Sequence, residues 1–425
     1  MKILWLSHIV PYPPKGGVLQ RSYHLLRELA QRNEVHLVSF IQREPLMRMF
    51  GDVERGLDEC RERLSSLCPI VRFIPIPSEE RPWGKKSLLL RSVLTRDPYS
   101  INWLKSAAMR AEIEMLTKTI SYDAVHFDTI SLAVHRDLVP HTACVLNHHN
   151  IESHMMLRRA SNERNWLARA YLYYEGRRLQ RYERDMCRRF DMHTTCSELD
   201  SERLVAVDSA IATTVIPNGV DIDYFKPGNA SRQPNTLVFA GRYSAYPNRR
   251  ALMFLANEIW PVLRQECPDV RIDIVGADPP ASVVELARQD PRFRVHGFVD
   301  DVRAYLDTAA VYICPIKDGG GTKLKVLDAL AMGIPLVADP IACEGIEVVE
   351  GQTVLYASSP TEYAARIKQL LADGELRQRM SRSARRLVEQ QYSYRSIGLQ
   401  LHEMYASLAD SSEGAMRSRT NVCRA

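Results

Sequence analysis

"PIKDGGGTKLKVLDALAMGIPLV", residues 315 to 337, joins a glycine-rich turn, a helical pattern and the start of a buried strand. Its three glycines, residues 319 to 321, leave backbone N–H groups unhindered where the helix begins, and the helix dipole favours negative charge there. Lys323 and Lys325 add positive charge. Asp328 lies ~9 Å along the helix axis from the end of the turn. The stretch therefore predicts an anion site with a carboxylate further along the same helix.

The ligand that fits this spacing is a nucleoside diphosphate. Glycine amides and lysines suit its phosphates, and a carboxylate can accept two hydrogen bonds from the vicinal hydroxyls of ribose. Gly333 supplies the end of the helix, and Pro335 precedes the next strand. The alternative interpretation is an ordinary glycine loop with solvated lysines and an acid on the helix surface.

The alternation of strand and helix extends on both sides of this stretch. Near the start, strand "KILWLSHIV", a helix and strand "EVHLVSF" form a β-α-β pattern. In the second half, apolar segments alternate with helical stretches: "TLVFAG", "VRIDIVG", "FRVHGF", "AVYICP", "IPLVAD" and "TVLYA". The pattern predicts an α/β protein with two doubly wound, mostly parallel sheets. The loops at Gly241, Gly276, Gly297 and residues 319–321 should then face one crevice.

The length of 425 residues exceeds what one hydrophobic core usually supports, so we expect two domains. We place the first domain at residues 1–205 and the second at residues 206–393. A helix over residues 394–410 would pack back on the first domain, and the polar tail, residues 411–425, would be disordered.

Composition excludes several classes of protein. Apolar content of 45% and charged content of 25% are ordinary for a folded chain, and the net charge of +5 is mild. The nine cysteines form no C-x-x-C pair or zinc-like cluster, so we predict neither disulfides nor a metal site. No apolar run is long enough to span a bilayer, and the start does not resemble a signal peptide. We expect a cytoplasmic protein without a nucleic-acid partner.

Residues 81–110 interleave arginine and lysine with apolar side chains, among them Trp83, Leu90 and Trp103. An amphipathic segment of this kind can lie on a membrane surface. The alternative is a partly buried helical excursion with a solvated face. Peripheral contact with an anionic membrane, at the inner face of the cytoplasmic membrane, is therefore an expectation of the sequence.

Several motifs together resemble the glycosyltransferases of family 4, which have the GT-B fold of two facing Rossmann-like domains with a cleft between them. The segments that carry the resemblance cover most of the chain: "PPKGG", "HHNIESHMMLRRA", "YERDMCRRFD", "CSELDSERL", "VIPNGVDIDYFKP", "VFAGRYSAYPN", "VHGFVDDVRAYL", "GGGTKLKVLDALAMGIPLVA" and "CEGIEV". No single piece is decisive, but their order and spacing are specific.

The resemblance implies a metal-independent, cofactor-free hexosyltransferase that retains the configuration at the anomeric carbon. Its donor would be a nucleotide-diphosphate sugar. Its acceptor would be a glycan or a polyprenyl-linked molecule in exopolysaccharide or cell-envelope polysaccharide synthesis.

Three departures from the family pattern affect the donor site, of which the shorter carboxylate at position 328 is the mildest. Asp328 takes the place of the second glutamate in the family's paired-glutamate motif and would hold the ribose hydroxyls, whereas the first glutamate falls on Gly320. Arg242 matches the arginine that grips the diphosphate, but the lysine commonly found after it is replaced around Asn248. Lys323 and Lys325 would supply the positive charge of the replaced lysine.

The catalytic roles follow from the same match. Arg242 and Lys323 would stabilise charge on the departing diphosphate. His149 of "NHHNIES" matches the family histidine near the donor sugar, with His148 as the alternative. No carboxylate pair is placed for an enzyme nucleophile, which favours front-face attack with the departing phosphate accepting the proton.

The complete prediction names catalytic residues His149, Arg242 and Lys323, and donor-binding residues Gly16, Gly17, Arg242, Gly297, Phe298, Gly319, Gly320, Gly321, Thr322, Lys323, Lys325 and Asp328. Gly16 and Gly17 could bring backbone N–H groups against a ligand, although a plain turn is the alternative. Asp221 and Asp223 imitate the acid pair that holds a metal in the other main glycosyltransferase fold, but their position in the interdomain connection favours a structural role.

Two other functions are compatible with parts of the sequence. A catalytically silent nucleotide-sugar-binding protein of the same fold would explain the missing glutamate at Gly320. An NAD-dependent oxidoreductase would share the sheet pattern, but "PYPPKGG" stands where the G-x-G-x-x-G motif would follow the first strand.

Overall fold

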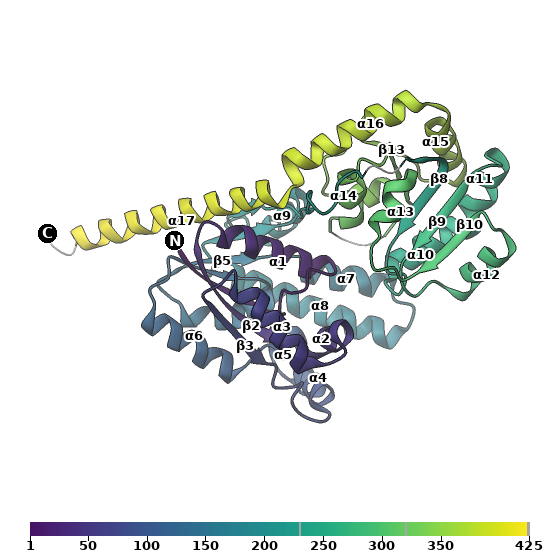
Figure 1. Ribbon diagram of the computed structural model, residues 1–425. Helices are drawn as coiled ribbons and strands as arrows, with labels where there is room; N and C mark the ends of the chain where they lie inside the picture. Colours follow the sequence, from purple (N-terminus) through teal and green to yellow (C-terminus); the bar gives the residue numbers. More distant parts are fainter. Residues whose placement is uncertain (229–230, 319–320, 423–425) are drawn as a thin grey trace. The chain divides into compact units, whose positions relative to one another are not determined.

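The protein divides into two compact units in the computed structural model, which describes residues 1–228, 231–318 and 321–422. The first unit contains Met1–Pro217 and Ile397–Ala425, and the second contains Asn218–Ser396. Each unit has one parallel sheet with helices around it (Figure 1). The predicted α/β class with two parallel-sheet domains is confirmed.

The sheet of the first unit has the strand order β3-β2-β1-β4-β5-β6-β7, and all neighbours are parallel. The strands are β1 (Lys2–Ser7), β2 (Glu34–Ile41), β3 (Ile70–Pro75), β4 (Ala124–Phe127), β5 (Ala143–Asn147), β6 (Met192–Thr195) and β7 (Thr213–Val215). The helices are α1 (Gly17–Ala30), α2 (Arg43–Phe50), α3 (Val53–Ser65), α4 (Gly84–Leu94), α5 (Tyr99–Trp103), α6 (Ala107–Thr119), η1 (Ile130–Leu138), α7 (Glu152–Asn162), α8 (Trp166–Cys187), α9 (Glu198–Val205) and α17 (Tyr394–Val422).

Side chains of β1 alternate between two apolar layers, as the period of a strand requires. Leu4 and Leu6 join the layer that α6 and the end of α8 complete. Ile3 and Trp5 join the opposite layer, which contains residues of α1, α3 and α17. Because both faces are buried, the strand reads in sequence as a nearly continuous apolar run.

The sheet of the second unit has the order β10-β9-β8-β11-β12-β13, again with parallel neighbours. The strands are β8 (Gln233–Ala240), β9 (Arg271–Val275), β10 (Phe293–Gly297), β11 (Ala309–Cys314), β12 (Leu336–Ala338) and β13 (Val354–Tyr356). The helices are α10 (Tyr246–Phe254), η2 (Leu255–Ile259), α11 (Trp260–Glu266), α12 (Ala281–Gln289), α13 (Arg303–Thr308), α14 (Leu324–Ala331), η3 (Pro340–Cys343), α15 (Pro360–Ala372), α16 (Gly374–Leu387) and η4 (Val388–Tyr392). One apolar cluster runs through this unit.

The boundary between the units differs from the prediction. Residues 206–217 belong to the first unit, not to the second domain, where the sequence analysis placed them. The reason is β7, which pairs with β6 at the edge of the first sheet from Thr213 opposite His193.

Helix α17 completes the first unit. Ile397, Leu401 and Tyr405 are buried in its core beside α1. The helix continues through residues 411–422, where the sequence analysis predicted a disordered tail. That segment contains no proline to end the helix. Among the described residues, no helix is both long and apolar enough to cross a membrane.

The close approach of α17 to α1 yields a prediction about stability. A Cβ atom on Gly398 would lie 2.2 Å from Cβ of Glu28, so even alanine forces the two helices apart. Gly398→Ala should lower the unfolding free energy by about 1–3 kcal/mol, measured as a fall in the thermal midpoint. Leu399→Ala on the exposed side of the same helix is the control. Equal midpoints for the two variants would contradict this packing.

Candidate functional site

Each sheet has a switch point, a pair of neighbouring strands from which the chain leaves toward opposite sides of the sheet. In open parallel sheets, ligands bind beside the carboxyl ends of such strands. The switch points are β8 beside β11 in the second unit and β1 beside β4 in the first. Gly16, Gly17 and His149 belong to the first unit, and the other predicted site residues belong to the second.

Lys325 lies against the carboxyl end of β8. Its Nζ donates a hydrogen bond to Oδ1 of Asn248 at 2.6 Å, and a Cβ atom built on Gly241 would lie 2.5 Å from the same Nζ. Nδ2 of Asn248 in turn donates to the backbone oxygen of Arg242 at 2.8 Å. Asn248 thus fixes the ammonium group of Lys325 beside the loop that carries Arg242, whose side chain is exposed.

Burial brings the pKa values of Lys325 and Asp328 close to neutral pH. Burial lowers the pKa of Lys325 to about 8, although Cys314 and Asp328 oppose the shift. Burial raises the pKa of Asp328 to about 7, and the charge of Lys325 opposes that shift. A phosphate would stabilise the charged lysine, and hydroxyl donors would stabilise the charged carboxylate.

The turn before α14 also presents polar groups. Nζ of Lys323 donates to the backbone oxygen of Gly321 at 2.7 Å. Gly321 has φ of 69°, a conformation that favours glycine. Oγ1 of Thr322 is buried and has no hydrogen-bond partner among the residues that the structure describes. Gly319 and Gly320 lie outside those residues.

The neighbouring loops bring glycine backbones together at the same edge of the sheet. N of Gly276 donates to O of Gly297 at 2.7 Å, and N of Gly241 donates to O of Val275 at 2.9 Å. A Cβ atom on Gly276 would lie 1.8 Å from O of Gly241, so only glycine fits there. Phe298, directly after β10, is 72% exposed. The edge therefore has closely packed glycine backbones, hydrogen-bonded to one another, and an uncovered aromatic ring.

Asp221 has a role in a turn. Its Oδ1 accepts hydrogen bonds from the backbone N–H groups of Asp223 and Tyr224, both at 3.1 Å. This is the pattern of an Asx turn.

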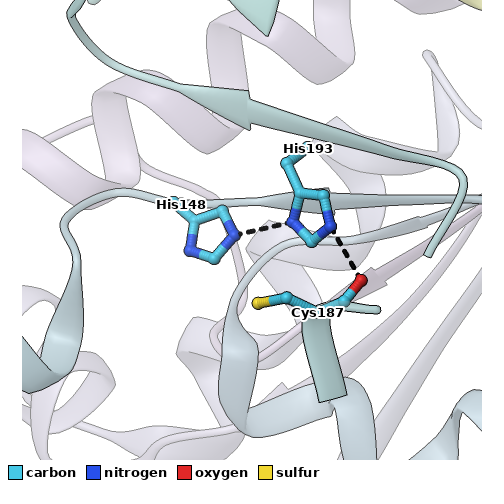
Figure 2. A group of neighbouring side chains, drawn as sticks. All are labelled: His148, Cys187 and His193. Carbon is cyan, nitrogen blue, oxygen red and sulfur yellow. Dashed lines mark hydrogen bonds between the residues drawn. The ribbon is translucent and has the colours of Figure 1, made fainter. Parts of the chain in front are cut away.

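In the first unit, the chain after β5 separates the two histidines that the sequence left as alternatives. His148 is buried, and its Nε2 lies 3.0 Å from Nδ1 of His193, whose Nε2 contacts the backbone oxygen of Cys187 at 3.0 Å (Figure 2). Burial lowers the pKa of His148 well below its ordinary value and that of His193 to about 4, so both rings are neutral.

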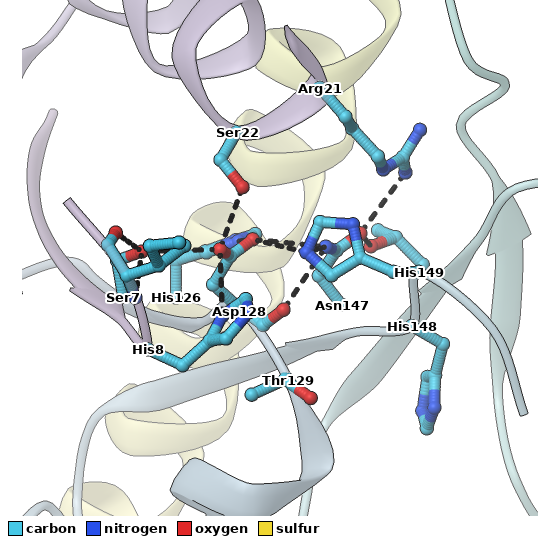
Figure 3. Close-up of polar contacts among 12 residues, drawn as sticks. Ser7, His8, Arg21, Ser22, His126, Asp128, Thr129, Asn147, His148 and His149 are labelled. Atoms are coloured by element: carbon cyan, nitrogen blue, oxygen red, sulfur yellow. Dashed lines mark hydrogen bonds and ion pairs between the residues drawn. The ribbon is translucent and has the colours of Figure 1, made fainter. Parts of the chain in front are cut away.

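His149 lies in a polar cluster around Asp128, at the switch point of the first sheet (Figure 3). Nε2 of His149 is 3.2 Å from Oδ1 of Asp128. The remaining contacts of the carboxylate are with Asn147 Nδ2 at 3.1 Å, Ser22 Oγ at 2.8 Å, Ser7 Oγ at 3.3 Å, His8 Nδ1 at 3.5 Å and His126 Nε2 at 3.7 Å.

The carboxylate of Asp128 stays charged inside this cluster. Burial by itself would raise its pKa, but the interaction and hydrogen bond with His149 and the nearby rings of His126 and His8 hold the pKa well below its usual range. His126 is held from its other side, since its Nδ1 lies 2.7 Å from the hydroxyl of Tyr405 on α17.

Gly16 and Gly17 lie at the exposed start of α1, and Gly16 has φ of 103°. One turn further on, Ser22 donates to Asp128, and Nη2 of Arg21 donates to Oδ1 of Asn147 at 3.0 Å. The start of α1 is therefore anchored to the cluster that contains His149.

Among the residues that the structure describes, two groups of side chains have donor atoms close enough to hold a metal ion, with all atoms within 4.8 Å of one another: His148, Cys187 and His193, and His8, Asp128 and His149. In the first group, burial raises the pKa of the Cys187 thiol, which disfavours the thiolate that metals bind.

The sequence analysis missed His8 and Asp128. Each directly follows a strand of the first sheet, β1 and β4 respectively. A polar residue at the carboxyl end of a buried strand was the available signal, but only the pairing of β1 with β4 brings these two together.

Comparison with known proteins identifies the class. Residues 234–373 match the family model described as glycosyl transferases group 1, and residues 15–224 match the model of glycosyltransferase family 4. The two matches together cover most of the chain. This protein belongs to glycosyltransferase family 4, and its two parallel-sheet units have the GT-B fold, as the sequence predicted.

Solved structures agree on the fold. HepE from Anabaena, crystallised with UDP, has 16% identity and a TM-score of 0.64, with coverage of 96% of this chain and 100% of that chain. Sucrose-phosphate synthase from Thermosynechococcus elongatus has 17% identity and a TM-score of 0.69, with coverage of 97% and 100%.

A curated relative, an uncharacterized 44.6 kDa protein in the cps region of Klebsiella pneumoniae, is 24% identical over 138 residues. The match includes 31% of this chain and spans about a third, 36%, of the length of that relative.

The electrostatics of Asp328 yield a prediction. The pKa of Asp328 is higher in the folded protein than in the unfolded chain, so ionisation of this carboxyl lowers the stability of the fold. The loss of stability begins as the pH rises above the unfolded pKa and is largest at and above pH 7. Asp328→Asn should therefore raise the unfolding free energy by on the order of 1–2 kcal/mol at pH 8, with a smaller gain at pH 5. Thermal unfolding at the two pH values measures this. A loss of stability at pH 8 would contradict the prediction.

Proposed function

We propose that this glycosyltransferase transfers a hexose from a nucleotide-diphosphate sugar to a glycan or polyprenyl-linked acceptor, with retention at the anomeric carbon and without a metal. The observation that carries the proposal is the ammonium group of Lys325 beside the carboxyl end of β8, at the switch point of the second sheet. HepE, whose fold is similar, has been crystallised with UDP and with UDP-glucose, which supports a nucleotide-sugar donor.

The proposed donor site assigns one part of the ligand to each group of residues. Arg242, Lys323 and Lys325, with the amides of residues 319–321 and the Thr322 hydroxyl, bind the diphosphate. Asp328 accepts hydrogen bonds from the ribose hydroxyls. Gly297 and Phe298 contact the base.

Charge stabilisation would then perform most of the catalysis. Negative charge builds on the phosphate oxygens as the nucleoside diphosphate leaves, and fixed cations lower that barrier directly. Arginine presents a planar fork to two oxygens, and lysine acts as a compact charge. With these cations in place, a divalent ion has no charge left to neutralise.

Retention is proposed to follow from front-face attack. The acceptor oxygen bonds to the anomeric carbon as the bond to the phosphate oxygen breaks, and the departing phosphate takes the proton of the acceptor hydroxyl. His149 contacts the sugar that is transferred. The location of the Klebsiella pneumoniae relative in a cps region supports a role in exopolysaccharide or cell-envelope polysaccharide synthesis.

A surface of the first unit supports the proposed membrane contact. On α4 and the turn before it, Trp83 is 73% exposed, Leu90 72% and Leu94 86%. Around these side chains lie the exposed basic residues Arg81, Lys85, Lys86, Arg91 and Arg96. We propose that this basic and apolar surface binds anionic lipids at the cytoplasmic face of the membrane.

Helix α8 contacts the end of α4 through Tyr174 and Arg178. Its exposed residues include Trp166, Leu167 and Tyr174, and the hydroxyl of Tyr174 donates to the backbone oxygen of Val93 at 3.3 Å. Nη2 of Arg178, which is buried, donates to the backbone oxygen of Ser92 at 2.8 Å and so ties the end of α4 to α8.

A screen of UDP, GDP, ADP and TDP sugars tests the function. One nucleotide should stabilise the protein by ~2.7 kcal/mol at 100-fold excess over its Kd, and the matching sugar donor should release that nucleotide when acceptor is present. If a nucleotide stabilises the protein but no acceptor causes its release from the sugar donor, the protein is a catalytically silent nucleotide-sugar-binding protein. Gly320, which stands in place of the family's first glutamate, is the reason to test this alternative. Absence of both would refute the donor site.

Substitutions in the donor site should separate binding from chemistry. Lys323→Ala should lower kcat by about 10²–10³-fold, because it removes charge that acts on the leaving group, and should change the donor KM only a few-fold. Asp328→Ala should instead raise the donor Kd by about tenfold, through lost hydrogen bonds to ribose. Steady-state kinetics and calorimetry distinguish the two. Unchanged values for both variants would refute these assignments.

Membrane binding can be measured by flotation with phosphatidylglycerol liposomes. The triple variant Arg81→Gln, Lys86→Gln, Arg91→Gln should bind about 10²-fold more weakly, since each basic residue contributes about 1 kcal/mol near an anionic surface. The control replaces Arg288, Lys368 and Arg379 of the second unit, also exposed, with Gln. Equal flotation of both triple variants would rule out this surface.

A further inference from the structure

A cavity of about 260 Å³ lies inside the first unit, between α4, α5 and the segment that leads from β3 into α4. Helices α4 and α5 lie side by side there (Figure 1). Among the twelve described residues that line the cavity, Arg81, Arg91 and Lys105 are basic and none is acidic. The volume is below the usual range of small-molecule pockets, so the cavity suits an anionic headgroup rather than a whole nucleotide sugar.

One side of α4 forms a wall of this cavity. The helix lines it with positions 84, 87, 88, 91 and 92, which fall on one side because of the helical period. The opposite side, positions 89, 90, 93 and 94, is apolar and exposed. An amphipathic surface helix normally turns its apolar side toward the protein. Helix α4 does the reverse, which fits a helix whose apolar side meets lipid.

Arg81 and Arg91 have no counter-charge from the protein. Neither guanidinium group makes an ion pair or a side-chain hydrogen bond with any residue that the structure describes, and both residues are exposed. The third base, Lys105, is paired with Asp97 at 2.6 Å. Two guanidinium groups at one cavity can each present a planar fork to phosphate oxygens, so the cavity favours a phosphate ligand.

Two buried donors in the wall also lack a partner. Oγ of Ser78 and Nε1 of Trp103 make no hydrogen bond within the described part of the chain, and both residues line the cavity. Buried polar groups are normally hydrogen-bonded. Donors that the protein leaves unpaired therefore favour a ligand that brings acceptor oxygens.

Hydrogen bonds fix the wall that the end of α4 forms. The buried guanidinium group of Arg178, on α8, donates to the backbone oxygens of Ser92 at 2.8 Å and Asp97 at 2.6 Å. Nδ2 of Asn102 on α5 donates to Oγ1 of Thr95 at 2.8 Å. These bonds join α4 to α5 and α8, so the cavity is built into the fold of the first unit.

The cavity lies at the edge of the first sheet where ligand sites form. The segment with Ser78 and Arg81 leaves the carboxyl end of β3, and every strand of this sheet is parallel to its neighbours. At the same edge, Nε2 of Gln42, after β2, donates to the backbone oxygen of His8, after β1, at 2.9 Å. A molecule held by its phosphate in this cavity can extend along the carboxyl edge, where ligands of parallel sheets bind.

We propose that this cavity binds the phosphate group of a lipid-linked acceptor, and that Arg81 and Arg91 recognise it. This inference rests on the proposed glycosyl transfer and narrows the acceptor to a polyprenyl phosphate or diphosphate. The phosphate oxygens accept hydrogen bonds from the two guanidinium groups. The polyprenyl chain leaves the cavity past the apolar side of α4, which distinguishes a lipid from free phosphate.

Binding of farnesyl phosphate, a short polyprenyl phosphate, tests the cavity on the whole chain without a sugar donor. Calorimetry should show that the wild type binds farnesyl phosphate more tightly than inorganic phosphate or farnesol. The double variant Arg81→Gln, Arg91→Gln should raise the Kd of farnesyl phosphate by about tenfold or more, because hydrogen bonds between charged groups are lost. No binding by the wild type, or equal affinity for inorganic phosphate, would overturn the proposal.

A matched double variant separates the cavity from the charged surface around it. Lys86→Gln, Arg96→Gln removes the same charge from the same surface, but both residues lie outside the lining of the cavity. Its Kd for farnesyl phosphate should stay within about twofold of the wild type, because salt screens exposed charges away from the ligand. If both double variants lose the same affinity, surface charge alone attracts the ligand and the cavity has no specific role.

A third variant tests the cavity without changing its charge. Ser87→Trp places an indole in the lining, so it should weaken binding of farnesyl phosphate as the loss of the two arginines does. Unchanged binding in this variant would contradict a ligand inside the cavity.

Transfer kinetics distinguish this inference from the proposed function. The Arg81→Gln, Arg91→Gln variant should raise the KM of a polyprenyl-phosphate-linked acceptor by about tenfold and leave the KM of an octyl glycoside, which has no phosphate, unchanged. If the wild type transfers sugar but neither KM changes in the variant, the inference fails and the proposed function stands. If the wild type binds farnesyl phosphate but transfers to no acceptor, the proposed function and the acceptor role fail together, whereas binding of a lipid phosphate stands.

Discussion

The parallel direction of every strand is the constraint on which both sites depend. Since all strands of a sheet run the same way, the loops that follow them emerge at one edge, and residues distant in sequence become neighbours there. Asp128 follows β4 and lies beside Ser7, which ends β1, and His8, which follows it. Lys325, in the helix after β11, reaches the end of β8 at Gly241. In each unit, the pairing of two strands at the switch point brings the polar groups together.

The carboxylates of the two sites, Asp128 and Asp328, have different surroundings. Asp128 receives contacts from six side chains, which keep its pKa low and hold those side chains in fixed orientations. Within the described residues, the charge of Lys325 is what opposes the raised pKa of Asp328. A carboxylate such as Asp128, whose charge is stabilised by side chains of the protein, fixes the orientation of those side chains. A carboxylate that the protein leaves poorly solvated is suited to a ligand that brings hydroxyl groups.

The sequence predicted the sheets well because strands buried on both faces appear as short apolar runs. Each of the six segments predicted in the second half coincides with one of β8 to β13. The edge strand β7 was missed because "TTV" is short and only partly buried, and the domain boundary was misplaced with it.

The details of the sites depend on information that local patterns lack. Whether His148 or His149 faces the core depends on how the chain leaves β5, and which lysine reaches Gly241 depends on the phase of α14. His8 and Asp128 become partners only through the order of strands in the sheet.

Because the first unit is assembled from segments on both sides of the second unit in the sequence, it cannot be completed before α17 has been synthesised. Ile397, Leu401 and Tyr405 fill the layer over Trp5 and Val35, and Tyr405 contacts His126 through its hydroxyl. On the ribosome, residues 1–217 emerge with that layer still open, and the intervening unit, residues 218–396, can fold on its own first. The apolar face under α17 therefore remains uncovered until α17 itself leaves the exit tunnel, a period in which a chaperone could shield it.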